Sequence, residues 1–194
     1  MTEVDLGGQN SFIGAWHLEE GDVCDELVDY FKNSPAKVAG QVGDGQVDKE
    51  VKDSVDLQIS YDHFTDPPVF RYLNNLTRVC QKYVEKYQAS GAVDAWGIAE
   101  KINIQHYEPS GGYKIWHCER WGKGMPSAAR HLVFMTYLND VSDAGGTEFL
   151  YQGITVQPKK GLTLIWPADW THHHRGVVSP TEDKYIITGW FSFM

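Results

Sequence analysis

The sequence predicts a mainly β fold of the α+β class: a double-stranded β-helix, or jelly roll, of about eight strands buttressed by two N-terminal helices. Two observations support this prediction. Helical spacing of apolar residues is confined to the first 96 residues, whereas short β-rich runs alternate with turn residues from residue 97 onward. Helices that precede a run of short antiparallel strands favour a jelly roll with helices packed on one side.

Two segments of the first half have the helical pattern. The first begins after Asp22, a residue type that caps helices well, and is expected to end at Pro35. The second begins near Asp66, where two prolines suit a first turn, and is expected to close at Gly91. Both are interpreted as supporting helices that pack on a sheet.

The rest of the first half contains two short strands and a long loop. Residues 1–10 are polar and are expected to form a loose arm, followed by a strand over Phe12–His17. Residues 40–53 are rich in glycine and charge, which indicates either an exposed loop that acts as a lid or a plain surface excursion. Apolar residues alternate over 55–59, which predicts a strand.

The second half contains the eight strands of the predicted roll. They are expected over Ile98–Tyr107, Tyr113–Cys118, His131–Tyr137, Thr147–Tyr151, Ile154–Val156, Leu162–Trp166, His172–Val178 and Tyr185–Phe193. In such a fold the inward-facing residues of several strands converge on one cavity.

Composition limits the function classes. The 194 residues suit a single domain over 1–194, with helices and a lid region in 1–96 and the jelly-roll core in 97–194. A net charge of −9 argues against binding to nucleic acid or to an anionic membrane. Three distant cysteines and an N-terminus without signal-peptide features lead us to expect reduced thiols and a cytoplasmic protein, whose oligomeric state is left open.

A metal-binding pattern lies in the second half. His117 and Glu119 are two residues apart, so a strand would present an imidazole and a carboxylate on one face. A histidine from a distant strand would complete the set, and His172 and His174 share a face there. Two histidines and one carboxylate, with the remaining positions open, suit non-haem Fe(II) and the activation of O₂.

A single cation follows this pattern. Lys184 comes ten residues after His174 and is suited to hold the carboxylate of an organic co-substrate. Arg175 competes with it, but alternates out of phase with His174 and is expected to face away. Cys118 faces opposite to its neighbours, and without a suitable His/Asp partner set we interpret it as a packing residue.

In this region the chain resembles the Fe(II)/2-oxoglutarate dioxygenases, and within them the prolyl 4-hydroxylase-like branch. The resemblance covers roughly residues 98–193 and rests on segments 107–119, 135–140, 145–149, 156–161 and 174–185, followed by Trp190. It implies that His117, Glu119 and His174 bind the iron. His174 is preferred as the second histidine ligand, because His174-Arg175-Gly176 followed by a basic residue ten positions after His174 matches the family pattern. His172 is then the alternative ligand, or a residue that supports the ligands or lines the cavity. The family usually has Asp where this chain has Glu119.

The resemblance also implies roles around the iron. Lys184 would pair with the distal carboxylate of 2-oxoglutarate, Tyr107 would support that carboxylate, and Tyr137 would line the same pocket. The residues expected on the substrate side are Tyr113, Trp116 and Trp121. Trp190 is interpreted as a packing residue.

The implied activity is hydroxylation of an unactivated C–H bond, with a prolyl residue in a peptide or protein as the first expectation. Fe(II), 2-oxoglutarate and O₂ would be required, succinate and CO₂ would be co-products, and ascorbate would serve as a reductant. The loop 40–53 and the turn 120–130 would form the walls of the site. The alternatives are a free amino acid or small metabolite as substrate, a non-catalytic jelly-roll module that binds a metal or a small acid, and a cupin-type hydrolase or isomerase.

Overall fold

The computed structural model describes residues 1–7, 11–43, 45–121 and 124–194. The two long helices are α1 (Val23–Asn33) and α2 (Pro67–Lys86). The strands are β1 (Gly14–His17), β2 (Val38–Ala39), β3 (Lys52–Asp53), β4 (Val55–Ile59), β5 (Trp96–Gly97), β6 (Ile102–Tyr107), β7 (Gly112–Tyr113), β8 (Arg130–Tyr137), β9 (Thr147–Phe149), β10 (Ile154–Val156), β11 (Leu162–Pro167), β12 (His174–Gly176) and β13 (Lys184–Phe193).

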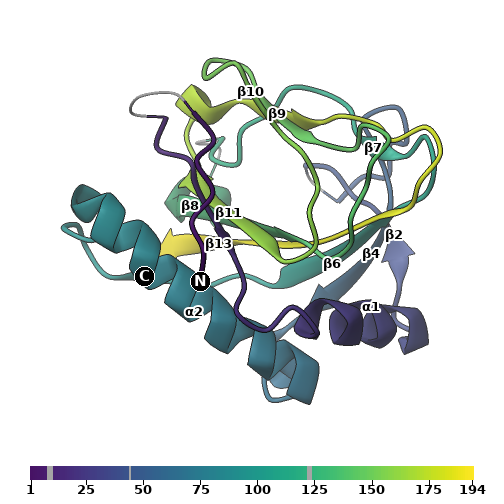
Figure 1. Ribbon diagram of the computed structural model, residues 1–194, viewed down its shortest axis with the longest axis horizontal. Helices are drawn as coiled ribbons and strands as arrows, with labels where there is room; N and C mark the ends of the chain where they lie inside the picture. The colour runs from purple at the N-terminus through teal and green to yellow at the C-terminus, as the bar shows by residue number, and fades with distance from the viewer. Residues whose placement is uncertain (8–10, 44, 122–123) are drawn as a thin grey trace.

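The strands curl into a roll, and both helices lie on one side of it (Figure 1). The large antiparallel sheet has the order β1-β11-β8-β13-β6-β4-β2, and β5 pairs with β13. A smaller sheet has the order β10-β9-β12, and an isolated bridge joins His117 to His174 of β12. The prediction of a mainly β jelly roll buttressed by two helices is confirmed.

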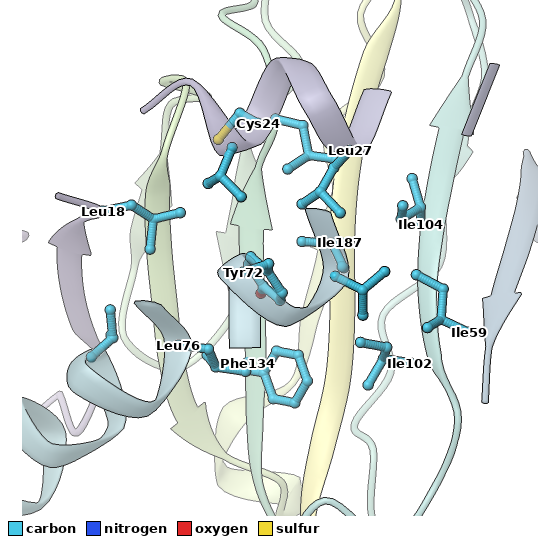
Figure 2. Packing of buried hydrophobic residues seen from close by; sticks show 14 of the residues in the cluster. Leu18, Cys24, Leu27, Ile59, Tyr72, Leu76, Ile102, Ile104, Phe134 and Ile187 are labelled. Atoms are coloured by element: carbon cyan, nitrogen blue, oxygen red, sulfur yellow. The ribbon is translucent and has the colours of Figure 1, made fainter. Parts of the chain in front are cut away.

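One face of the large sheet packs against the helices (Figure 2). Leu27 of α1 and Tyr72 of α2 lie against Phe134 of β8 and Ile187 of β13, and each of these side chains is fully buried. Full burial of a side chain of this size stabilises the fold by about 1.5–3 kcal/mol. The Tyr72 hydroxyl hydrogen-bonds Thr136 Oγ1 at 3.0 Å, which satisfies both polar groups in the core.

The opposite face of the large sheet lines the interior of the roll. Alternation along β13 sends Ile187 toward the helices, whereas Lys184, Ile186, Thr188 and Trp190 line the interior cavity. A single strand therefore contributes both to the core and to the candidate site.

Two predictions for the first half of the chain are wrong: the end of the second helix and the loose N-terminal arm. α2 ends at Lys86 rather than at Gly91, because the backbone of Tyr87 leaves the helical region (φ −120°, ψ 68°) and a 3-10 turn over Gln88–Ser90 follows. The Ser90 carbonyl accepts hydrogen bonds from Trp96 Nε1 (3.0 Å) and the His131 ring (2.9 Å). The N-terminal residues are not a loose arm, since the amide of Val4 donates to Ala15 O and the amide of His17 to Thr2 O. Residues 8–10 of that expected arm lie outside the described residues.

The predicted lid segment 40–53 is anchored at its C-terminal end. Lys52 pairs with Tyr113 and Asp53 with Gly112, so β3 and β7 form a short two-stranded sheet. The amide of Lys114 donates to Val51 O at 2.8 Å. This pairing attaches the segment directly to the chain that leads into His117. Asp44 of the segment lies outside the described residues.

Within the described residues, the search for membrane spans finds no helix with the length and apolar character that crossing a bilayer requires.

Candidate active site

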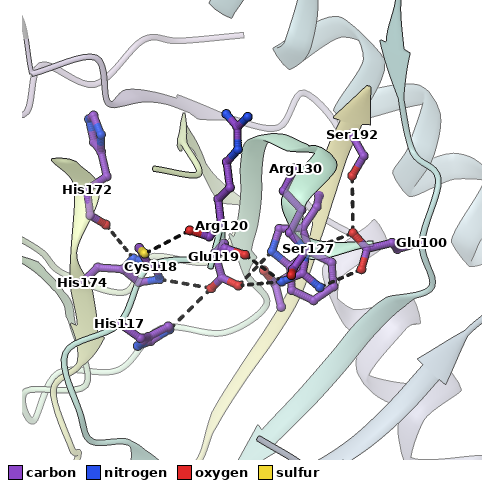
Figure 3. Close-up of polar contacts among 12 residues, drawn as sticks. Glu100, His117, Cys118, Glu119, Arg120, Ser127, Arg130, His172, His174 and Ser192 are labelled. Atoms are coloured by element: carbon purple, nitrogen blue, oxygen red, sulfur yellow. Dashed lines mark hydrogen bonds and ion pairs between the residues drawn. The ribbon is translucent and has the colours of Figure 1, made fainter. Parts of the chain in front are cut away.

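His117, Glu119 and His174 come together inside the roll, and Figure 3 shows their side chains converging. The backbones of His117 and His174 exchange hydrogen bonds of 3.0 and 2.8 Å, which sets the two histidines directly opposite each other. The predicted strand Tyr113–Cys118 is shorter than expected, because regular pairing stops at Tyr113 and resumes only as this bridge. The i, i+2 relation still brings His117 and Glu119 into one cluster.

The geometry of the cluster suits a metal ion. Glu119 Oε1 lies 3.4 Å from His117 Nε2 and 3.5 Å from His174 Nε2, and the three candidate ligand atoms lie within 4.8 Å of one another. The Nδ1 atoms of His117 and His174 hydrogen-bond Ile115 O and His172 O, each at 3.0 Å. Because a carbonyl oxygen only accepts, Nδ1 carries the proton in each ring and the Nε2 lone pairs face Glu119.

The electrostatics agree with this arrangement. Burial by itself would raise the pKa of Glu119, but its contacts with His117 and His174 hold this pKa well below its ordinary value. Burial, together with His117, lowers the pKa of His174. Glu119 is therefore ionised, and burial favours the neutral imidazole of His174, as metal ligation needs.

The outer oxygen of Glu119 is held by residues that the sequence did not reveal. Trp190 Nε1 donates to Glu119 Oε2 at 3.0 Å, and Arg130 Nη1 lies 3.4 Å from the same oxygen. Glu100 accepts from Arg130 Nε (2.9 Å) and Nη2 (2.7 Å), and Ser192 Oγ donates to Glu100 at 3.3 Å (Figure 3). Trp190 is thus more than a packing residue, and its alternation in phase with Lys184 along β13 is a signal that would have identified it.

Lys184 lies deep in the same cavity. The residue is 5% exposed, and its Nζ donates to Gly145 O at 3.0 Å and lies 4.9 Å from the Tyr107 ring centre. Within the described part of the chain, no ion pair to a carboxylate is found for this ammonium. Burial lowers the pKa of Lys184 to about 8. A buried cation without an anion is costly, so this position is prepared for an acidic ligand.

Tyr107 and Tyr137 line the cavity near Lys184. The Tyr107 hydroxyl donates to Gln105 Oε1 at 2.7 Å, and that of Tyr137 donates to Thr147 Oγ1 at 2.7 Å. Burial raises the pKa of Tyr107 well above its ordinary value, so this phenol stays protonated. Both tyrosines therefore line the cavity that contains Lys184, and each hydroxyl has a protein partner.

The cavity measures about 960 Å³ and reaches from the histidine cluster to Lys184. Tyr113 lines it and stacks on His117, with ring centres 3.8 Å apart. Trp121 also lines it and is 56% exposed. The walls include Gln41, Val42, Gly43 and Lys52 of the predicted lid, and Gly124, Met125, Pro126 and Ser127 of the predicted turn. Gly122 and Lys123 of that turn lie outside the described residues.

The expectation that Trp116 lines the substrate side is wrong. Trp116 precedes His117 and points the opposite way, where the guanidinium of Arg175 lies 4.5 Å from its ring centre. Arg175 also pairs with Glu148 at 2.9 Å and faces away from the cavity, as predicted. Cys118 is buried, and burial raises the pKa of its thiol, which agrees with a packing role.

His172 has a supporting position. It ends a 3-10 turn rather than extending β12, so it does not share a strand face with His174. Its ring hydrogen-bonds Ser11 O and Thr171 Oγ1, each at 2.9 Å, and its carbonyl oxygen holds His174 Nδ1. The structure brings His174, and not His172, to Glu119.

The sequence model of the 2OG-Fe(II) oxygenase superfamily matches residues 102–192, which include every residue of the metal cluster and Lys184. Over this segment, which is slightly less than half of its length, the chain resembles the superfamily. The superfamily implies Fe(II), 2-oxoglutarate and O₂ as cofactor and co-substrates, and the His117–Glu119–His174 cluster lies within the matched residues.

Curated proteins and solved structures are also similar to this chain. Prolyl 4-hydroxylase subunit alpha-1 of Rattus norvegicus is 27% identical over 47% of this chain, which spans only 20% of that relative. A prolyl-4-hydroxylase of Pseudomonas putida has a TM-score of 0.70 at 16% identity, covering 95% of this chain and 94% of that one. A prolyl hydroxylase of Trichoplax adhaerens, in complex with a hypoxia-inducible factor peptide, has a TM-score of 0.72 at 14% identity, covering 94% and 84%. The oxygenase is thus similar in fold to prolyl hydroxylases.

Proposed function

We propose that this oxygenase hydroxylates an unactivated C–H bond of a prolyl residue in a peptide or protein, with succinate and CO₂ as co-products. One observation carries the proposal: a single cavity contains both the His117–Glu119–His174 cluster and the buried ammonium of Lys184. The first group suits Fe(II), and the second suits the distal carboxylate of 2-oxoglutarate. Similarity to prolyl hydroxylases supports the prolyl substrate.

We propose that Nε2 of His117, Nε2 of His174 and the carboxylate of Glu119 hold the iron. The donor set fits this ion, because two imidazoles and one carboxylate leave open positions for co-substrates. When bound, the iron supplies the oxidative chemistry that attacks an unactivated C–H bond. The carbonyl oxygens of Ile115 and His172 keep both rings oriented by accepting from Nδ1.

Lys184 anchors the co-substrate in this proposal. A carboxylate beside Nζ stabilises the charged form of a lysine whose pKa burial has lowered to about 8. Tyr107 and Tyr137 border the same space and orient the co-substrate by contact and hydrogen bonding. This end of the cavity is deep and dry, so the charged contact is stronger than it would be in water.

The substrate enters from the opposite, open side. Tyr113 and Trp121 offer aromatic surface to a proline ring there, and the walls at 41–43 and 124–127 restrict the access of water to the reacting bond. Keeping water away from the reacting bond matters because the oxidant must react with the substrate and not with solvent.

An anaerobic titration with Fe(II) and 2-oxoglutarate tests the site, followed by admission of O₂ and a succinate assay. We expect a visible charge-transfer band, loss of that band in His174→Ala and in Glu119→Ala, and formation of succinate. A band without succinate would favour a binding module, and metal-dependent turnover without consumption of 2-oxoglutarate would favour a cupin-type hydrolase or isomerase. Adding ascorbate to the same assay tests whether it serves as a reductant.

A free amino acid is the second candidate substrate, and one observation favours it. Lys52 and Asp56 form a buried ion pair of 2.5 Å in the cavity wall, and Ser54 Oγ donates to Asp56 at 2.7 Å. These opposite charges complement the carboxylate and ammonium groups of a zwitterion. Comparing succinate formation with proline-containing peptides and with free amino acids separates the two candidates. Acceleration by free amino acids alone would overturn the peptide proposal.

A further inference from the structure

The metal cluster contains a glutamate, whose carboxylate has more freedom than that of an aspartate. An additional methylene adds a torsion, so either oxygen or both can turn toward an ion. Carboxylates bind metals through one oxygen or through two, and the two modes differ in how many positions they occupy. The structure shows that the two oxygens of Glu119 have different surroundings.

Oε1 faces the two imidazoles, at 3.4 Å from His117 Nε2 and 3.5 Å from His174 Nε2. Oε2 faces the other way and meets two donors, Trp190 Nε1 at 3.0 Å and Arg130 Nη1 at 3.4 Å. The two carboxylate oxygens of Glu119 thus differ: Oε1 faces the candidate metal position, and Oε2 is held by donors from the protein.

The donors to Oε2 are themselves well fixed. The Arg130 guanidinium stacks on Trp190 with its central carbon 3.5 Å from the ring centre. Its other nitrogens make two hydrogen bonds to Glu100, and its Nη1 also donates to the backbone oxygen of Glu119 at 3.0 Å. Trp190 and Arg130 come from neighbouring strands, β13 and β8, which pair at this level. We call Trp190, Arg130 and Glu100 the glutamate clamp.

We propose that the glutamate clamp makes Trp190 and Arg130 positioning residues that restrict Glu119 to one-oxygen ligation, through Oε1. This inference rests on the proposed metal site. A six-coordinate ion bound by two imidazoles and one oxygen keeps about three open positions, whereas a two-oxygen glutamate leaves about two. Three positions accommodate a chelating keto acid and O₂ together.

The test uses Mn(II) as the probe, because the relaxation rate of water protons reports how many waters the bound ion carries. We expect Trp190→Phe combined with Arg130→Lys to lower this relaxivity, per bound ion, by about one third, as one of about three waters is displaced. Trp96→Phe is the matched control: it removes an indole N–H that donates to Ser90 O, also at 3.0 Å, far from Glu119. It should retain the wild-type relaxivity.

A second comparison uses the Glu119→Asp background. A shorter carboxylate does not reach both the ion and the clamp, so the clamp substitutions should change the relaxivity little there. Equal relaxivity per bound ion in the wild type and the clamp variant would overturn the inference, even if Mn(II) affinity fell. Failure of the wild-type protein to bind Mn(II) at all would instead overturn the proposed metal site. Circular dichroism of each variant checks that the fold is retained.

Discussion

The buried position of Lys184 makes the binding of 2-oxoglutarate sensitive to pH in the mildly alkaline range. In the ligand-free protein, burial lowers the pKa of this lysine to about 8. The distal carboxylate of 2-oxoglutarate needs the charged form, and at low pH that form is already present. Affinity is therefore greatest below pH 8 and declines as the pH rises through this value.

The size of the effect follows from the charged fraction. With a pKa of about 8, about nine-tenths of Lys184 is protonated at pH 7 and about one-tenth at pH 9. Since the apparent dissociation constant scales inversely with the competent fraction, it should rise about tenfold, or about 1.4 kcal/mol. Calorimetry of 2-oxoglutarate binding to the Mn(II)-loaded protein at both pH values, without oxygen, measures this change.

Two controls separate Lys184 from the metal site. 2-Oxobutyrate retains the keto acid but lacks the second carboxylate, so its binding should change much less between pH 7 and pH 9. Lys184→Arg keeps its charge throughout, and whatever affinity remains should be nearly independent of pH. A wild-type affinity that is equal at pH 7 and pH 9, or one that falls equally for 2-oxobutyrate, would refute the assignment of Lys184 as the anchor.

Three further predictions follow from individual contacts. Lys184→Met should stabilise the ligand-free protein at pH 7 by up to about 3 kcal/mol in urea unfolding, because the unfolded lysine binds its proton more tightly than the buried one. This gain in the free energy of unfolding should be full below pH 8, where Lys184 is charged in both states. It should vanish as the pH rises past 10.5, the pKa of the lysine in the unfolded chain. A variant that is less stable than the wild type at pH 7 would contradict the prediction. His174→Ala should abolish Mn(II) binding, whereas His172→Ala should retain it while losing about 1–3 kcal/mol of stability, since only the ring contacts with Ser11 and Thr171 are removed. Limited proteolysis should cut the segment 40–51 more slowly when Mn(II), 2-oxoglutarate and a proline peptide are bound, and equal cutting in both states would remove its role as a lid.

Local patterns were sufficient for the main elements and for part of the site. The 3.6-residue spacing predicted both helices, and alternation predicted the strands of the roll, because each depends on which face of one element is buried. The i, i+2 spacing of His117 and Glu119 likewise brings both into one cluster, even though regular strand pairing is interrupted between Tyr113 and His117. Lys184 was identified from its position ten residues after His174, which matches the pattern of the family that the chain resembles.

Only the tertiary structure determined which side chains from separate strands contact one another in the site. Spacing left His172 and His174 as alternatives, and the backbone pairing of His174 with His117 selected one of them. The clamp on Glu119 joins residues 100, 130 and 190, whose proximity arises from the register of β8 against β13. Local sequence determines which way a side chain points along its own strand. The pairing of strands far apart in the chain determines what that side chain meets, because register is set by the packing of the whole sheet.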